Sequence, residues 1–381
     1  MKKKIFYWSP CLNPVGTVIS TLNSAISLSK YDKNNDVKLI NVCGEWDQYR
    51  KLLNENSIDL IDLNFKYFKI LPKRGFFGSR FSYLVIFLLS FFPLYFLLKK
   101  EQPSKIILHL ITSLPLTLLN LFKFKTDFIL RISGYPKLNI IRKFFWKFSS
   151  KKIKIVTCPT LDLKKDLENS NLFKQKNLHY LPDAIIKITN FKKKNLQNDS
   201  DLIKHKRIVL SVGRLTKQKN FSYLINEFSE FLKVNGDFIL LILGEGEEKK
   251  KLNKLIEKKQ LKEKIFLLGF KKNVYRFMKN SEIFVLSSLW EEVGFVMVEA
   301  AICNTYIISS DCPNGPKEFL NNGKNGILFK NNSKDALLKS LMNYCNLDKK
   351  KIYLDKVVLK KNTRKYTMFK HYLILNKLLK I

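Results

Sequence analysis

Short apolar runs alternate with helical patterns through residues 207–309, and this alternation is the strongest constraint on the fold. Strands that alternate with helices pair in parallel, because each crossover helix returns the chain to the same end of the sheet. Ligands of such sheets bind at the carboxyl ends of the strands, so the loops that follow the strands are the candidate site. The expected strands are 207–212, 238–243, 265–268, 283–286 and 306–309, with helices at 221–234, 247–259, 274–279 and 294–303.

The loop after the first of these strands is rich in glycine and positive charge. It reads Gly213-Arg214-Leu215-Thr216-Lys217-Gln218-Lys219. Arg214 and Lys219 are suited to a diphosphate, arginine through its planar fork and lysine as a point charge. The chain contains 69 basic residues, so such a pair is also expected without any function. Gly244 and Gly246 follow the second strand, where they permit either close approach to a ligand or a plain turn.

Two glutamates eight residues apart, Glu291 and Glu299, flank Gly294 after the fourth strand. Gly294 is the expected start of a helix, whose free N–H groups and positive dipole end suit a phosphate. A carboxylate accepts several hydrogen bonds and therefore suits a group that carries many hydroxyls. Because a phosphate beside hydroxyl groups is the chemistry of a nucleotide sugar, this segment indicates a nucleotide-sugar site.

Taken in order, these loops resemble the donor-binding half of the family 4 retaining glycosyltransferases (glycosyltransferases group 1) of the bacterial surface-polysaccharide type. The family pattern is G-R-L-x-x-x-K, a G-x-G strand end, L-G-[FY], E-x7-E, P-x-G-P-x-E and N-G. The matching segments are 213–219, 244–246, 268–270, 291–299, 313–318 and 325–326. The resemblance is strong over 208–329 and loose elsewhere. It implies an α/β protein of the GT-B fold, with two Rossmann-like, doubly wound parallel-sheet domains that face each other across a cleft.

The resemblance also implies a role for each matching residue. Arg214 and Lys219 would bind the donor diphosphate, and with Glu291, which would hold the transferred sugar, they form the expected catalytic set. Their effect would be electrostatic stabilisation of the departing charge. Glu299 would hold the ribose hydroxyls. Further donor contacts are expected at Gly16, Gly244, Gly294 and Phe295. A hexosyltransferase of this family retains the anomeric configuration, and neither a metal nor a cofactor besides the nucleotide diphosphate sugar is expected.

The first half of the chain matches the family less closely. Family members often have a Gly-Gly pair in the early loop, where this chain has Asn13-Pro14-Val15-Gly16-Thr17, and Gly16 is the candidate for close approach to phosphate and acceptor. Many members carry a histidine after a central strand, but the corresponding strand, 128–132, is followed by none here. His109 either replaces it in part or is a buried structural residue. Arg131 either faces the acceptor or pairs with an acid.

Two segments of the first half suggest contact with lipid. Residues 82–98 are uncharged and apolar, and they fit a buried helix, an interfacial helix or a short transmembrane span. Residues 139–154 interleave Lys and Arg with aromatic residues, which is typical of a membrane-surface helix or of an ordinary helix with a solvated lysine face. Much of the net charge of +37 lies here, because 63–161 contain 18 basic residues and two acids, Glu101 and Asp127. Such a field attracts polyanions.

A change of composition marks the domain boundary. The polar stretch 187–206 separates an acceptor-binding domain, 1–184, with a basic membrane-facing surface, from a donor-binding domain, 185–362. Residues 363–381 are expected to form a helix that crosses back to the first domain. The six cysteines form no CxxC pair or Cys/His cluster, which favours a reducing compartment without structural zinc. The first apolar run, 5–8, is too short for a signal peptide.

These observations predict a transferase that moves a sugar from a UDP-sugar to a lipid-linked or cell-surface glycan acceptor, as in lipopolysaccharide, O-antigen or capsule assembly. It would lie in the cytoplasm, peripheral on the inner face of the cell membrane, with the anionic lipid surface as a partner. A nucleotide-sugar epimerase of the same fold is one alternative, although the intact 291–299 motif argues against it. The other is an inert basic protein that binds membrane or nucleic acid. Nucleic acid is not an expected partner, since no RNA-binding motif is present; such binding would depend steeply on salt.

Overall fold

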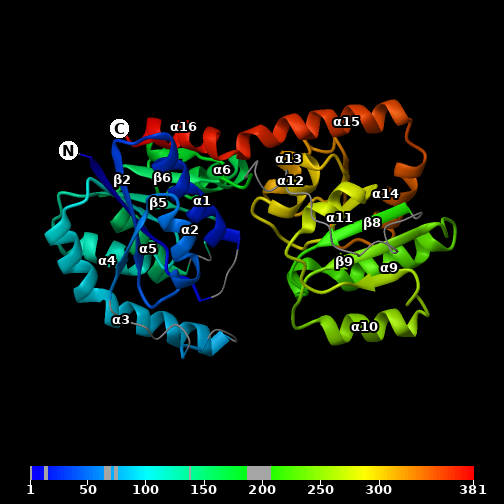
Figure 1. The fold of residues 1–381 in the computed structure, drawn as a ribbon, viewed down its shortest axis with the longest axis horizontal. Helices are drawn as coiled ribbons and strands as arrows, with labels where there is room; N and C mark the ends of the chain where they lie inside the picture. The colour runs from blue at the N-terminus through cyan, green and yellow to red at the C-terminus, as the bar shows by residue number, and fades with distance from the viewer. Residues whose placement is uncertain (1, 13–15, 64–69, 73–75, 137–138, 187–206) are drawn as a thin grey trace. The chain divides into compact units, whose positions relative to one another are not determined.

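The computed structural model describes residues 2–12, 16–63, 70–72, 76–136, 139–186 and 207–381. The chain divides into two compact units (Figure 1). Unit 1 comprises Met1–Ile185 and Tyr366–Ile381, and unit 2 comprises Ile186–Lys365. The polar stretch 187–206 and residues 13–15 of the early loop lie outside the described residues. Each unit is an α/β domain built on one parallel sheet, which confirms the expected fold class.

Unit 1 contains a seven-stranded sheet in the order β3-β2-β1-β4-β5-β6-β7, and all neighbouring strands are parallel. Residues 5–8 of β1 are at most 1% exposed, because helices cover both faces of the sheet. The strands are β1 (Lys3–Trp8), β2 (Asn35–Asn41), β3 (Asp59–Asp62), β4 (Lys105–Leu108), β5 (Asp127–Arg131), β6 (Ile155–Cys158) and β7 (Leu178–Tyr180).

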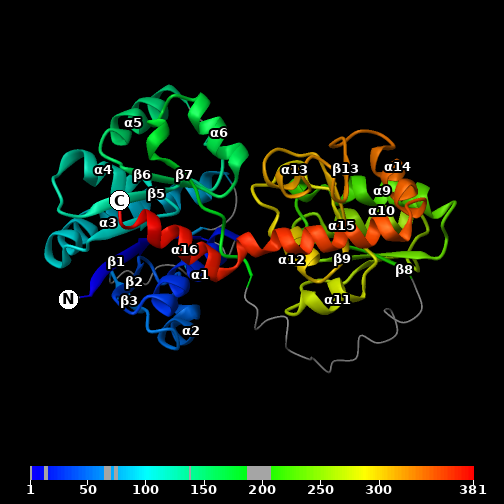
Figure 2. The same cartoon turned by 90° about the horizontal axis from the view of Figure 1, so that it is seen from above.

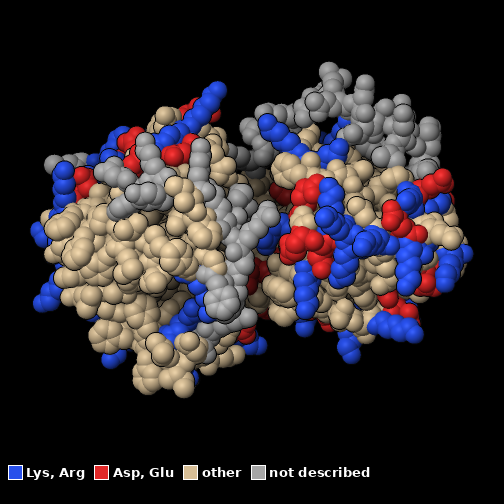
Figure 3. Space-filling view, turned by 90° about the horizontal axis from the view of Figure 1, so that it is seen from below, with Lys and Arg blue, Asp and Glu red and all other residues tan. Residues whose placement is uncertain are grey.

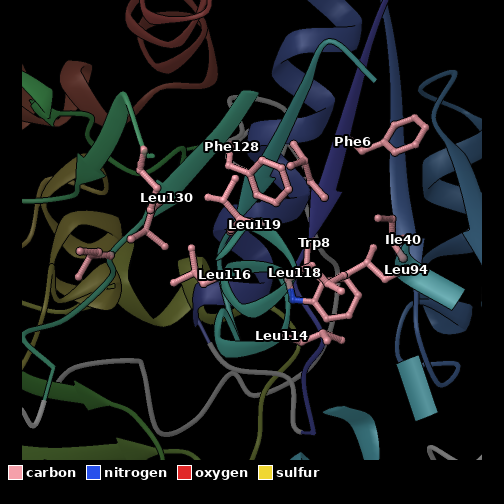
Figure 4. Packing of buried hydrophobic residues seen from close by; sticks show 14 of the residues in the cluster. Phe6, Trp8, Ile40, Leu94, Leu114, Leu116, Leu118, Leu119, Phe128 and Leu130 are labelled. Carbon is pink, nitrogen blue, oxygen red and sulfur yellow. The ribbon is translucent and has the colours of Figure 1, made fainter. Parts of the chain in front are cut away.

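The helices of unit 1 divide between the two faces of the sheet. Side chains from α3, α4 and α6 share one core cluster with Phe6 and Trp8, as Figure 4 shows for α3 and α4. Side chains from α1, α2 and α16 share the other with Ile5 and Tyr7, because successive residues of a strand point to opposite faces. The helices are α1 (Gly16–Tyr31), α2 (Arg50–Asn54), α3 (Phe76–Glu101), α4 (Ser113–Leu121), α5 (Ile140–Ser150), α6 (Leu161–Asn169) and α16 (Met368–Leu378).

Helix α3 packs against the sheet along a single stripe. Its buried residues recur at every fourth position, which places them on one side of a helix. They are Ser82, Ile86, Ser90, Leu94 and Leu98. Among the described residues, 78–101 form the one helical stretch that is long and apolar enough to cross a membrane, judged by length and composition alone.

Unit 2 contains a six-stranded parallel sheet in the order β10-β9-β8-β11-β12-β13, and every strand expected between 207 and 309 is present. The strands are β8 (Arg207–Val212), β9 (Phe238–Leu243), β10 (Ile265–Leu267), β11 (Ile283–Leu286), β12 (Tyr306–Ser310) and β13 (Ile327–Phe329). The helices are α9 (Phe221–Leu232), α10 (Lys249–Lys258), α11 (Val274–Asn280), α12 (Phe295–Ile302), α13 (Gly315–Phe319), α14 (Ala336–Cys345) and α15 (Lys349–Asn362).

After α15 the chain returns to unit 1. A 3-10 turn, Thr363–Tyr366, leads into α16, so the final regular helix begins at Met368. Helix α16 lies beside α1 (Figure 2). The backbone N–H of Ile185 donates to the carbonyl oxygen of Tyr366 at 2.9 Å, which ties the two crossing segments of chain together inside unit 1.

Both sheets have a topological switch point beside their first strand. Strand β1 lies between β2 and β4, and β8 lies between β9 and β11. The loops that follow β1 and β4 lead to opposite faces of the sheet, and so do the loops that follow β8 and β11. The two loops of each pair therefore diverge at the carboxyl ends of the strands and leave room for a ligand. In unit 2 the loops at this position are 213–220, after β8, and 287–294, after β11.

Candidate active site

The two loops at the switch point of unit 2 are tied together by hydrogen bonds. The backbone N–H of Leu289 donates to the carbonyl oxygen of Gln218 at 2.8 Å. The Oγ of Ser287 donates to the carbonyl oxygen of Lys219, also at 2.8 Å. Because β8 and β11 are neighbours in the sheet, residues about 70 positions apart in the sequence meet here.

Lys219 and Glu291 form an ion pair at this junction. The Oγ of Ser288 donates to the same carboxylate oxygen at 2.6 Å. The side chains of Lys219 and Glu291 are only 13% and 9% exposed, so water screens their attraction poorly. The stem of Lys219 lies against Gly213, where a Cβ atom would come within 3.0 Å of Lys219 Cε. Two residues of the expected catalytic set are therefore brought together.

Arg214, the third member of the expected set, is exposed on the same loop. The next residue is held in place, since the N–H of Leu215 donates to the carbonyl oxygen of Glu245 at 2.9 Å. Within the described part of the chain, Arg214 makes no side-chain ion pair. A solvated guanidinium on an anchored backbone can therefore turn towards an anion without first breaking an internal contact.

Gly244 and Gly246 allow the loop after β9 to lie directly against the loop after β8. Gly244 has a φ of +143°, and a Cβ atom there would lie 1.8 Å from the carbonyl oxygen of Gly213. At Gly246 a Cβ atom would lie 2.3 Å from the carbonyl oxygen of Leu215. The structure thus gives Gly244 a packing role that holds Gly213 in place. Contact between Gly244 and a donor stays a prediction.

Glu299 lies in the second turn of α12 and accepts a hydrogen bond from the hydroxyl of Tyr275 at 3.0 Å. Burial raises the pKa of Glu299 to about 7, although the hydrogen bond from Tyr275 acts in the opposite direction. Burial disfavours the charged form of a carboxyl group, so this side chain changes its charge near neutral pH. Tyr275, on α11, was not predicted from the sequence, because nothing in the local pattern distinguishes it from a packing residue.

Gly294 caps the start of α12 in the left-handed conformation, with φ 73° and ψ 58°. Glycine adopts this conformation without strain, which explains its position between the two glutamates. The N–H groups of the first helical turn, from Phe295 onward, have no partner within the helix and suit an anion. The start of α13 packs against this segment, since the N–H of Gly315 donates to the carbonyl oxygen of Glu292 at 2.7 Å.

The predicted residues of unit 1 lie at or just after the carboxyl ends of β1, β4 and β5. Gly16 begins α1 and is exposed. Arg131, at the end of β5, is 2% exposed and forms an ion pair with the buried Asp183, so of the two roles considered for it the structure shows the pairing with an acid. His109 is buried, its ring centroid lies 5.8 Å from that of Tyr7, and burial holds its pKa well below the usual value.

A cavity of about 780 Å³ opens in unit 1 beside the loops that follow β1 and β4. Helices α3, α4 and α5 complete its walls. Aromatic and apolar side chains dominate the lining, together with a few polar groups, a composition typical of a small-molecule site. The lining includes Tyr83, Asn139, Ile141, Arg142, Phe145 and Trp146.

Comparison with known proteins agrees with this geometry. Residues 192–358 match the family model of the glycosyl transferases group 1, the family that the resemblance predicted. An uncharacterized glycosyltransferase of Methanocaldococcus jannaschii is 29% identical over 296 residues, which cover 69% of this chain and 72% of that protein. A Campylobacter jejuni enzyme, N-acetylgalactosamine-N,N'-diacetylbacillosaminyl-diphospho-undecaprenol 4-alpha-N-acetylgalactosaminyltransferase, is 32% identical over 41% of this chain and 42% of its own length.

Solved structures share the fold over the whole chain. A glycosyltransferase of Rickettsia africae superimposes with a TM-score of 0.78 at 17% identity, covering 100% of this chain and 98% of that one. Anabaena HepE in complex with UDP superimposes with a TM-score of 0.73 at 13% identity, covering 100% of both chains. Identities this low establish the fold alone. The fold is therefore that of the GT-B glycosyltransferases.

Proposed function

We propose that this protein is a retaining, metal-independent glycosyltransferase that moves a hexosyl group from a UDP-sugar to a lipid-linked or cell-surface glycan acceptor. The observation that carries the proposal is the buried Lys219–Glu291 pair at the switch point of unit 2. Arg214 lies on the same loop as Lys219, and the start of α12 follows Glu291 by four residues. Two cations, a helix N-terminus and a carboxylate are the groups that a diphosphate bonded to a sugar requires.

Each of these residues has a defined task in such a transfer. When the bond between the sugar and the diphosphate breaks, negative charge grows on the departing phosphate oxygen, and Arg214 and Lys219 stabilise it. In the unliganded site Glu291 balances the charge of Lys219; with donor bound, its carboxylate accepts hydrogen bonds from the sugar hydroxyls and holds the reacting carbon in place. Glu299 accepts the ribose hydroxyls.

The acceptor side of the proposal rests on unit 1 and on relatives. The cavity of unit 1 lies at a switch point, as an acceptor site would, and Arg142 in its lining suits a phosphate-bearing headgroup. The Campylobacter jejuni relative is named for a diphospho-undecaprenol acceptor. A relative from Acholeplasma laidlawii, 33% identical over 35% of this chain, is named an alpha-monoglucosyldiacylglycerol synthase. Both names support a lipid-borne acceptor. A position on the inner face of the membrane is part of the same proposal.

A panel of UDP- and GDP-sugars, supplied to the full chain with bacterial membrane extract, tests the proposal. We expect release of UDP from one donor, with loss of release in Glu299→Ala and Arg214→Ala. The anomeric configuration of the product, read by NMR, should match that of the donor, and chelators should have no effect. Conversion of a UDP-sugar into its epimer without acceptor would establish the alternative enzyme. Failure to bind UDP at all would exclude the donor site and favour an inert binding protein.

The affinity for the UDP-sugar donor is expected to rise with pH through about 7. Burial raises the pKa of Glu299 to about 7, so below this pH the carboxyl group carries a proton that ribose hydroxyl donors must displace. If only the ionised form binds well, the affinity at pH 6 is about tenfold below its high-pH value. Titration calorimetry at pH 6, 7 and 8 measures this. A UDP-sugar is the right probe, because its diphosphate does not titrate in this range.

Two variants check that Glu299 is the titrating group. Glu299→Gln should bind the donor more weakly and without pH dependence. Tyr275→Phe removes a hydrogen bond that lowers the pKa of Glu299, so the midpoint should move to higher pH. A midpoint that stays in place in Glu299→Gln would assign the pH dependence to another group.

A further inference from the structure

The outward face of α3 is apolar along its length. Opposite the stripe that packs against the sheet lie Leu84, Leu88, Phe92 and Phe96, which are 54% to 63% exposed. A helix on the surface of a water-soluble domain normally presents charged or polar side chains there. A contiguous row of exposed, large apolar side chains marks an interaction surface.

Helix α5 presents a second apolar face. Ile140, Ile141, Phe144 and Phe148 are all more than half exposed, and their spacing places them on one side of the helix. Exposed cations flank them, including Arg142, Lys143 and Lys147. A helix with large apolar residues on one side and Lys or Arg on the other is typical of a segment that lies in a lipid–water interface.

These two helices cover the same face of unit 1. Helix α4 lies between them and contacts both. Ile86 of α3 belongs to the core cluster that also packs Phe145 of α5. Figure 3 shows the result as a broad area of uncharged side chains on this side of unit 1, with Lys and Arg and some Asp and Glu at its edge. The surface of unit 2 in the same view mixes basic and acidic side chains throughout. We refer to the exposed faces of α3 and α5 as the α3–α5 surface.

The stretch of sequence that carries the α3–α5 surface is rich in positive charge. Residues 63–161 contain 18 basic side chains against Glu101 and Asp127. Glu101 pairs with Lys4 at 2.9 Å and Asp127 pairs with Lys105 at 3.0 Å, so both acids are already neutralised. An apolar surface with a positive border complements anionic lipid, in which headgroups attract the border and acyl chains receive the apolar side chains.

The packing of α3 defines its orientation relative to a bilayer. A transmembrane helix in contact with lipid would need apolar surroundings on every side, but α3 is bound to its own sheet from Ser82 to Leu98. Only its outward face is open to lipid. Lys99 and Lys100 lie in the last turn of the helix and suit the headgroup level, as cations at the end of an interfacial helix do.

We propose that unit 1 docks on an anionic bilayer through the α3–α5 surface, with α3 parallel to the membrane plane. The cavity of unit 1 opens between these helices, since Tyr83 of α3 and Ile141 of α5 both line it. Docking in this orientation brings the mouth of the cavity to the headgroup layer. A lipid-borne acceptor then reaches unit 1 without leaving the bilayer, a consequence that rests on the proposed function.

Flotation of the full chain with vesicles tests the docking. Binding should be strong with phosphatidylglycerol-containing vesicles, weak with phosphatidylcholine alone, and reduced by salt. Leu88→Glu/Phe92→Glu should lower the partition coefficient at least about tenfold, because it removes two inserted side chains and adds two repelled charges. Adding Phe144→Glu to this double variant should lower the partition coefficient further. Val234→Glu/Tyr353→Glu is the matched control, since it changes exposed apolar residues of unit 2 to the same acid and should bind as the unmodified chain does.

Spin labels test the orientation separately. Cysteines placed singly at positions 84, 88, 92 and 96 should report the same shallow depth, about 5–10 Å, if α3 lies in the interface. Cys345→Ser is the suitable background, because the other five cysteines are buried. A steady change of depth along the four positions would overturn the parallel orientation.

Several results would overturn the docking itself. These are equal binding to neutral and anionic vesicles, undiminished binding of Leu88→Glu/Phe92→Glu, or a dimer of the free chain that these substitutions dissociate. UDP binding is measured on the same samples. It should be unchanged in the surface variants, so failure of docking and failure of the donor site give different results.

Discussion

Arg214→Ala is expected to lower kcat about 10²–10³-fold, equivalent to about 2.7–4 kcal/mol of transition-state stabilisation. Arg214 is exposed on the loop after β8, and the same loop carries Lys219 of the Lys219–Glu291 pair. Its proposed task is to neutralise charge that appears only as the diphosphate leaves, so the loss should fall mainly on kcat. Arg214→Lys should recover part of the rate, since it restores the charge but not the fork.

The control for this experiment is Lys217→Ala on the same loop. Lys217 is exposed, carries the same charge and lies outside the matching motif positions. It should change kcat less than about twofold, because its charge is solvated and screened. Both variants should melt within a few degrees of the unmodified protein. Equal loss of rate in the two would mean that general positive charge, rather than a positioned guanidinium, supports the reaction.

Asp183→Ala is expected to destabilise unit 1 by about 3–5 kcal/mol, because it leaves the guanidinium of Arg131 buried without its counter-ion. Arg131 and Asp183 are 2% and 6% exposed and form an ion pair. Asp183 also accepts a hydrogen bond from Ser20 at 2.5 Å, and Arg131 donates to the carbonyl oxygen of Leu181 at 2.6 Å. Urea unfolding followed by tryptophan fluorescence is the measurement, since Trp8, Trp46 and Trp146 lie in unit 1.

Asp127→Ala provides the matched comparison in the same unit. Asp127 pairs with Lys105 at 3.0 Å, but its side chain is 44% exposed. An ion pair of this kind contributes at most about 1 kcal/mol, so its loss should be small. The double variant Arg131→Met/Asp183→Leu should recover much of the stability that Asp183→Ala loses, because it removes both buried charges. A large effect of Asp127→Ala, or none of Asp183→Ala, would contradict this account.

Next to the pair at Asp183, a second set of buried hydrogen bonds holds α16 in unit 1. The Nδ1–H of His371 donates to the carbonyl oxygen of Pro182 at 2.7 Å, so its Nε2 accepts from Ser24 at 2.8 Å. Ser24 in turn accepts from the hydroxyl of Tyr7 at 2.9 Å. Burial lowers the pKa of His371 to about 4, which keeps the ring neutral and this arrangement of donors intact at physiological pH.

Local pattern was sufficient for several parts of this structure. Period-two and period-3.6 patterns depend on neighbouring residues only, so the strands from Arg207–Val212 to Tyr306–Ser310 and the helix after Gly294 could be predicted. The order of the motifs was sufficient for the family. The spacing of Glu291 and Glu299 around a glycine identified a helix start with two carboxylates, because eight residues there place one in the loop and one in the second turn.

Other features depend on contacts between distant parts of the chain. The meeting of Lys219 with Glu291 requires β8 and β11 to be neighbours, and no local pattern contains the order of strands in a sheet. The partner of Arg131 lies 52 residues away. The sequence left open whether Gly244 permits approach of a ligand or a plain turn, and only the structure shows that its missing side chain makes room for the backbone of Gly213. Tyr275 and Ser288 were identified as site residues only from the structure, which shows their hydrogen bonds to Glu299 and Glu291.

Residues 82–98 show the same division most clearly. Their composition indicates an apolar helix and leaves open whether that helix is buried, interfacial or spanning. The choice depends on which side of α3 meets the sheet, and only the packing of Ser82, Ile86, Ser90, Leu94 and Leu98 answers that. The sequence of a helix determines how much apolar surface the helix has. The arrangement of its neighbours decides how much of that surface is left for a partner.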